Sequence, residues 1–302
     1  MEQTSSHRDL LDADAIARGE TLGILARTVV EGYRVGEHRS PFRGFAIEFS
    51  QHREYTPGDD IRHLDWKVLG RTDRYYIKQY EQDTNFVAHL LIDGSSSMNY
   101  GSGKITKLHY AKALGACLAY LILLQRDAVA LHVFDTELRE TMTRTDNLEK
   151  IHSIMDRLAA FKATEQTRIG AALNDIARMT KARGIVMVIS DLFDDEEALE
   201  KGIRQIRFGG SEVVVFHVMD PYELEFPFHG TVEFIGLEGT LRMKTTPAAI
   251  RKSYLKSMND FRRRVHEICD RSGCHYILAN TGLSLGEMLS GYLAFRHKVA
   301  AR

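Results

Sequence analysis

The sequence predicts an α/β protein with a doubly wound, mostly parallel sheet flanked by helices. After residue 85, apolar segments rich in Val and Ile alternate with segments of helical periodicity. Most of these apolar segments are continuous, which is typical of strands buried on both faces. The chain has 302 residues, 44% of them hydrophobic and 27% charged, so it is long enough to bury such a core.

The first part of the chain has a different texture. Residues 1–40 place Ile16, Leu22 and Val29 on one side of a helical pattern and predict an N-terminal helical arm. Residues 41–85 alternate in short pieces and predict a small β-rich element. Within it, residues 53–66 mix acidic, basic and aromatic side chains. Two interpretations stay open for this segment: an ion-pair network that fastens the element to the main domain, or a partner surface.

The main domain is expected over residues 86–302. The expected strands are 86–92, 128–134, 185–189, 213–218 and 275–279. The expected helices are 105–125, 148–160, 169–181, 196–207, 247–271 and a last one from 284 to the end. Residues 230–244 alternate around a Glu-Gly turn and predict an inserted hairpin.

The first expected strand ends in Asp93-Gly-Ser-Ser-Ser97, one carboxylate followed by three hydroxyl groups. Taken alone, this segment is more typical of a turn with a helix cap. However, Thr167 precedes the helix expected from residue 169, and Asp191 follows the strand expected at 185–189. Ligands of an open parallel sheet bind at the carboxyl ends of its strands, so we expect these loops to converge. Thr164 is the alternative to Thr167.

These side chains predict one divalent-metal site with the ligands Asp93, Ser95, Ser97, Thr167 and Asp191. Mg²⁺ and Mn²⁺ prefer oxygen ligands in an octahedron. Since only two of the five side chains are carboxylates, the ion would keep its affinity for an outside ligand. An acidic residue of another protein could then complete the coordination shell.

The pattern Asp-x-Ser-x-Ser at 93–97, with Thr167 and Asp191, resembles the metal-ion-dependent adhesion site (MIDAS) of von Willebrand factor type A domains. Residues 107–112 and 126–134 are similar to that family's first helix and second strand. Residues 53–66 resemble the signature of the bacterial family called domain of unknown function 58, and residues 220–226 are similar to a later segment of it.

The resemblance implies a von Willebrand factor type A-like, Rossmann-like fold and a non-enzymatic protein-binding role. Members of the family commonly occur beside MoxR-type AAA+ ATPases. The implied partner is therefore such an ATPase, which would present an acidic residue to a Mg²⁺ or Mn²⁺ ion. The chain would act as its adaptor or chaperone-like companion.

A metal-dependent phosphoester hydrolase at the same site is the competing interpretation. Such enzymes often use paired ions held by several carboxylates and histidines. Asp194 and Asp195 could supplement Asp191, although acids there are typical of a helix start. His132 and His217 are expected as sheet residues rather than as a catalytic base. A phosphate-binding loop at residues 101–106 fails on the spacing of its glycines.

Charge and cysteine content limit which partners and which cellular compartment can be expected for the chain. Forty basic residues nearly balance 41 acidic ones, so we expect no nucleic-acid partner. The N-terminus lacks a signal-peptide pattern, and the longest uncharged apolar run is shorter than the about 17–25 residues of a membrane span. Three cysteines without paired spacing fit a reducing compartment. We expect a cytoplasmic chain that does not insert into membranes.

Overall fold

The computed structural model describes residues 48–56, 65–72, 74–81, 87–163, 166–180, 184–237 and 242–300 of the 302-residue chain. The helical arm predicted over residues 1–40 lies outside these ranges. So do Thr164 and residues 57–64 of the densely charged segment, so the two interpretations of that segment stay open.

A six-stranded sheet forms the centre of the molecule, in the order β10-β7-β6-β3-β4-β5. Its strands are β3 (Val87–Asp93), β4 (Ala128–Phe134), β5 (Leu138–Thr145), β6 (Gly184–Ser190), β7 (Glu212–Met219) and β10 (His275–Asn280). Every neighbouring pair is parallel except β4 and β5. The predicted fold class, a mostly parallel sheet flanked by helices, is confirmed.

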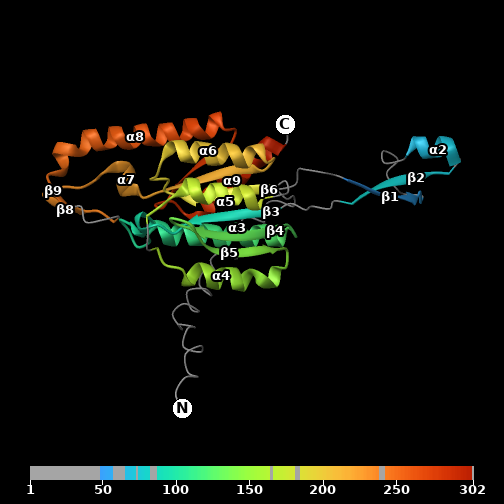
Figure 1. Cartoon of the computed structure of the whole chain (residues 1–302), viewed down its shortest axis with the longest axis horizontal. Coiled ribbons are helices and arrows are strands. Elements are labelled where there is room, and N and C mark those ends of the chain that lie inside the picture. The colour runs from blue at the N-terminus through green and yellow to red at the C-terminus, as the bar shows by residue number, and fades with distance from the viewer. Residues whose placement is uncertain are drawn as a thin grey trace, which may run out of the picture.

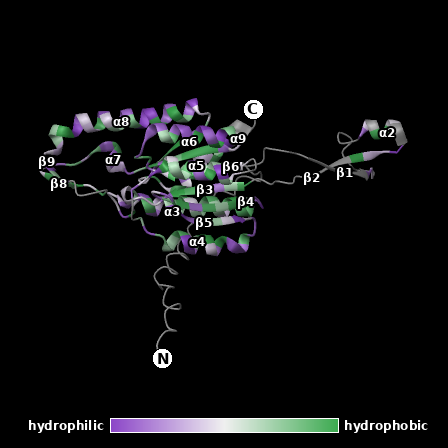
Figure 2. Ribbon diagram, viewed as in Figure 1, coloured by the Kyte–Doolittle hydropathy of each residue, from purple (hydrophilic) through white to green (hydrophobic). Residues whose placement is uncertain are grey.

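Helices cover both faces of this sheet (Figure 1). They are α3 (Lys107–Leu124), α4 (Ile151–Ala160), α5 (Ile169–Met179), α6 (Glu196–Phe208), α8 (Pro247–Arg271) and α9 (Leu285–Ala300). Because side chains alternate along a strand, Leu90 and Ile92 of β3 join the core formed with α3, α4 and α9, whereas Leu91 joins the core formed with α5, α6 and α8. Figure 2 shows hydrophobic residues concentrated in the sheet and the helices against it.

Helix α3 is the most deeply buried of these helices. It is long and apolar enough to cross a membrane by length and composition, but 83% of its apolar window is buried inside the protein. It has apolar residues on all sides, and these pack against the sheet and α4. Its composition is therefore that of a core helix.

Smaller elements complete the described chain. Strands β1 (Glu48–Glu54) and β2 (Tyr76–Glu81) pair antiparallel and carry α2 (Trp66–Thr72) between them, a unit drawn apart from the main body in Figure 1. The short helix α7 (Pro221–Glu225) follows β7. Strands β8 (Val232–Ile235) and β9 (Arg242–Thr245) pair antiparallel within the region where an inserted hairpin is expected. Two short 3₁₀ helices are η2 (Ser96–Asn99) and η3 (Leu148–Lys150).

Candidate functional site

The candidate site is centred on Asp93, the last residue of β3. This strand lies between β4 and β6. The chain therefore continues from β3 to β4 on one side of it and later adds β6 on its other side. Such a reversal in strand order opens a crevice at the carboxyl ends of the strands. The Asp93 side chain is fully buried there, and a buried carboxylate needs hydrogen-bond donors or a cation.

The loop after β3 turns its serines back toward Asp93. The Ser95 amide donates a hydrogen bond of 2.8 Å to Asp93 Oδ1, and the hydroxyl oxygens of Ser95 and Ser97 lie 3.0 Å apart. Gly94 makes this turn possible, since a Cβ atom there would come within 2.8 Å of the Phe161 ring. Two of the three consecutive hydroxyl groups therefore point to one place.

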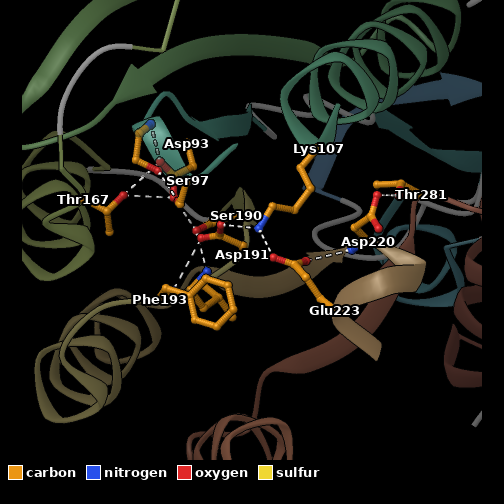
Figure 3. A network of polar contacts seen from close by, with 12 residues as sticks. Asp93, Ser97, Lys107, Thr167, Ser190, Asp191, Phe193, Asp220, Glu223 and Thr281 are labelled. Atoms are coloured by element: carbon orange, nitrogen blue, oxygen red, sulfur yellow. Dashed lines mark hydrogen bonds and ion pairs between the residues drawn. The ribbon is translucent and has the colours of Figure 1, made fainter. Parts of the chain in front are cut away.

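Two further hydroxyl groups reach Asp93 from distant parts of the chain (Figure 3). Thr167 Oγ1 donates to Asp93 Oδ1 at 2.9 Å and to Oδ2 at 3.1 Å. Ser190 Oγ, at the end of β6, donates to Asp93 Oδ2 at 2.5 Å. The structure thus joins Asp93, Ser95, Ser97 and Thr167 by direct hydrogen bonds and adds Ser190, which the sequence analysis missed.

Asp191 occupies the side of the site that faces helix α3. Its Oδ2 atom accepts a hydrogen bond of 2.8 Å from the Lys107 ammonium group, which also donates to Glu223 Oε1 at 2.7 Å. Asp191 and Lys107 are buried, and the next residue, Leu192, has a left-handed φ of 60°. A bulky residue rarely adopts this conformation. Asp191 lies beside Asp93 and forms an ion pair with the ammonium group of Lys107.

The charges of the site are not balanced within it. Burial, followed by the negative charge of Asp191, raises the pKa of Asp93 to about 7, although hydrogen bonds from Ser190 and Ser95 act in the opposite direction. Burial lowers the pKa of Lys107, but Asp191 and Glu223 outweigh it, so the net direction is upward. The Lys107 ammonium is shared between Asp191 and Glu223, and the negative charge of Asp191 acts on Asp93.

This arrangement fits a hard divalent cation. The carboxylates of Asp93 and Asp191 would supply negative charge to such an ion, and the Lys107 ammonium offsets part of the Asp191 charge. The hydroxyl groups of Ser95, Ser97 and Thr167 can serve as oxygen ligands because they accept as well as donate.

The acids considered for a second metal ion serve other purposes. Asp194 Oδ2 accepts a hydrogen bond of 2.6 Å from the Ile169 amide at the start of α5. Asp195 caps α6 through the amides of Glu197 and Ala198. Within the described ranges, no group of three or more His, Cys, Asp or Glu side chains is arranged to hold a metal. Asp194 and Asp195 therefore act at helix starts, as acids in their sequence positions typically do.

Both histidines considered as a base are engaged within the sheet. His132 lies 3.1 Å from a ring nitrogen of His89 on the neighbouring strand. His217 Nδ1 lies 2.9 Å from the Tyr276 hydroxyl on β10. Burial lowers the pKa of His132 to about 3 and that of His217 to about 4, with the His89 charge a second cause for His132. These are the properties expected of sheet residues.

Lys107 and Glu223 are the other participants that the sequence analysis missed. Lys107 begins α3, where the helix dipole disfavours a cation, and the helix that follows is apolar. A lysine in that position needs a buried carboxylate partner, which was the available signal. Glu223 belongs to the Asp220–Glu223 capping box of α7. Because the capping box already accounts for an acid at this position, the sequence gives no sign of its second contact with Lys107.

Comparisons with known proteins place the chain among bacterial relatives. Residues 51–264 match the family model described as "Protein of unknown function DUF58". The uncharacterized proteins Rv1480 of Mycobacterium tuberculosis and Mb1516 of Mycobacterium bovis are each 24% identical over 253 residues, which covers 82% of this chain and 79% of the relative.

Two solved structures are similar in shape. The conserved hypothetical protein BatB from Bacteroides thetaiotaomicron has a TM-score of 0.49 at 18% identity, over 71% of this chain and 100% of that one. The SpRpn10 VWA domain has a TM-score of 0.40 at 14% identity, over 68% of this chain and 93% of that one. Because the family model spans more than half of its residues, the chain belongs to the DUF58 family.

Proposed function

We propose that this chain is a non-enzymatic, divalent-metal-dependent protein-binding module of the cytoplasm. One Mg²⁺ or Mn²⁺ ion would be held by Asp93, Ser95, Ser97 and Thr167, with Asp191 at its side. The observation that carries the proposal is the buried Asp93 carboxylate, which lies at the switch in strand order, is surrounded by hydroxyl groups and has the Asp191 carboxylate beside it.

The protein's own residues would keep such a site open to a partner. When bound, the ion would supply a Lewis-acidic position for a carboxylate from another protein. The Lys107 ammonium offsets part of the negative charge of Asp191. The site would therefore donate less negative charge to the ion than its carboxylates would without the lysine. A partner's Glu or Asp would then be the strongest remaining ligand available.

The proposed partner is a MoxR-type AAA+ ATPase, with this chain as its adaptor or chaperone-like companion. Support comes from membership of the DUF58 family, whose members commonly occur beside such ATPases, together with the resemblance to MIDAS-containing domains. The acidic residue that reaches the ion would belong to the ATPase or to the client on which both act.

Substitution of the two inward-pointing serines tests the metal site. Ser95→Ala with Ser97→Ala should abolish Mg²⁺ and Mn²⁺ binding in a calorimetric titration because two hydroxyl ligands are removed. Ser96→Ala is the matched control: it changes the middle serine of the same run and should bind the metal as the wild type does. Circular dichroism should stay nearly unchanged in all three proteins.

The same variants test whether recognition of the proposed ATPase partner depends on the metal ion. Capture of a MoxR-type ATPase should be lost in EDTA and in the Ser95→Ala/Ser97→Ala variant and kept in Ser96→Ala. Unaltered metal affinity in the double variant would rule out the site, and metal-independent capture would remove the ion from recognition. Turnover of phosphoesters by the wild type, lost in the double variant, would instead establish the hydrolase.

A further inference from the structure

An aromatic groove lies beside the candidate metal centre. Its volume is about 490 Å³, and α7, the β8–β9 hairpin and α8 form most of its walls. Ten of its twelve lining residues are apolar or aromatic, and the other two are Glu223 and Glu233. A concave, mostly apolar surface with few polar groups is typical of a ligand-binding site.

The floor of the groove is a packed cluster of rings around Phe226. The Phe226 ring centroid lies 4.3 Å from that of Tyr254, 5.1 Å from that of Phe228 and 5.6 Å from that of Phe234. Phe226 has a left-handed φ of 49°, and Arg251 donates a hydrogen bond of 2.9 Å to its carbonyl. The floor is therefore held in place by several contacts, including a backbone conformation that is rare for a bulky residue.

The rim of the groove leaves large apolar side chains in contact with solvent. Tyr222 is 40% exposed, Met243 is 45% exposed and Ile235 is 57% exposed. Exposed apolar residues gathered around a concave floor mark an interaction surface more often than scattered ones do.

The groove and the candidate metal centre share a wall. Glu223 lines the groove and is bound by the Lys107 ammonium at 2.7 Å, and the same ammonium binds Asp191 at 2.8 Å (Figure 3). Tyr100, another lining residue, follows Ser97 closely in the chain, and its ring centroid lies 5.8 Å from the Lys107 ammonium. One segment of a partner can therefore reach both places.

The lining of the groove decides which side chain would enter it. Its two charged lining residues are Glu223, which Lys107 binds, and Glu233, which lies opposite Lys244 in the pair of strands β8 and β9. An uncharged bulky side chain gains from contact with the rings, whereas a charged one would lose its hydration among ten apolar or aromatic lining residues. An acidic residue of the same partner would go to the metal centre.

We propose that the groove binds a bulky aromatic or aliphatic side chain of the same partner segment whose acidic residue reaches the metal ion. This inference rests on the proposed function and adds a second specificity element to it. The recognised segment carries an acidic residue and a bulky apolar residue at a fixed spacing.

Selection of random linear peptides displayed on phage tests this. Against the full chain in Mg²⁺, enriched peptides should share an acidic and a bulky apolar position. Against the Ile235→Ser/Met243→Ser variant, which changes two exposed rim residues, enrichment should keep the acid and lose the apolar position. A synthetic peptide of the enriched sequence should bind this variant about tenfold or more weakly.

Phe208→Ser is the matched control, because the Phe208 side chain is 96% exposed on α6, outside the groove. This variant should bind the peptide within about twofold of the wild type. Enrichment of an acid without an apolar position, or an affinity unchanged by the rim substitutions, overturns the groove and leaves the proposed function standing.

Other results separate the two proposals further. If the enriched peptides share an apolar position with the wild type but not with the rim variant, the groove is supported. This holds even if the peptides bind without Mg²⁺, a result that contradicts the metal-dependent function. Enrichment of no peptide contradicts both. A wild-type dimer that the rim substitutions dissociate would show that a second copy of the chain fills the groove, and it would overturn the proposal of a partner segment.

Discussion

The Lys107 side chain lies almost entirely inside the protein, with 1% of its surface exposed. It contacts two carboxylates, of which Asp191 is fully buried and Glu223 is 13% exposed. A buried ammonium is stable only where such partners compensate for its lost hydration. Lys107 thereby connects helix α3 to the ends of β6 and α7, and it joins the candidate metal centre to the aromatic groove.

Replacing this lysine should be costly. Lys107→Met removes the cation and leaves two carboxylates uncompensated, so we expect the free energy of unfolding to fall by about 3–5 kcal/mol. Urea denaturation in metal-free buffer measures this change. Lys104→Met, at an exposed position nearby, is the control and should change the value by less than about 0.5 kcal/mol. A loss as small as that of the control would contradict a stabilising role for the ion pair.

Individual site residues were predictable where local sequence and strand order agree. Asp93, Ser95 and Ser97 follow a recognisable buried strand, and Thr167 precedes a recognisable helix, so their convergence could be expected from the sheet edge alone. Lys107 and Ser190 could not be placed in this way. Their roles depend on how α3 packs against the sheet and on which way the end of β6 turns.

At the scale of elements, β3 and β4 are joined by a pair of histidines, the buried His132 and the half-buried His89, as well as by the hydrogen bonds between the two strands. The rings of His89 and His132 are stacked, with centroids 5.3 Å apart. Burial lowers the pKa of His89, and burial together with the His89 charge lowers that of His132 to about 3. The His132 ring is therefore neutral in the folded protein at neutral pH.

The histidine pair makes stability depend on pH. Below about pH 6.5 the unfolded chain binds a proton at His132, whereas the folded chain does so only near pH 3. The stabilising contribution is therefore complete above pH 6.5 and is lost as the pH falls toward 3. Urea denaturation at pH 7, 6 and 5 should show stability falling faster in the wild type than in His132→Gln, by up to about 1.4 kcal/mol per pH unit. A difference between the two proteins that is independent of pH would contradict this assignment.

Elements were predictable in proportion to their burial. The five parallel strands were found within two residues, and four of them, β3, β4, β6 and β7, are almost fully buried apolar runs. Strand β5 was missed, since it is a half-exposed edge strand with alternating polar residues such as Arg139 and Glu140. Helices α2 and α7 were also missed. They have seven and five residues, too few for a periodic pattern, and α2 lies within the small β-rich element expected over residues 41–85.

At the scale of the whole molecule, strand order creates the site. Asp93, Thr167 and Ser190 are far apart in the sequence and meet because β3 lies between β4 and β6. The same edge of the sheet carries α7, which brings Glu223 and the aromatic groove to the centre. The molecule thus presents a polar centre and an apolar groove side by side, an arrangement suited to binding a partner segment.

The location of a bound paramagnetic ion tests the central claim most directly. Mn²⁺, added in small amounts to the isotope-labelled full chain, broadens the NMR signals of nearby amides. We predict that the amides of Gly94, Ser97 and Leu192 lose intensity first, that EDTA restores them, and that the Ser95→Ala/Ser97→Ala variant shows no such loss. Broadening that begins at exposed acidic residues elsewhere, or that is equal in the variant, would contradict a metal site at the end of β3.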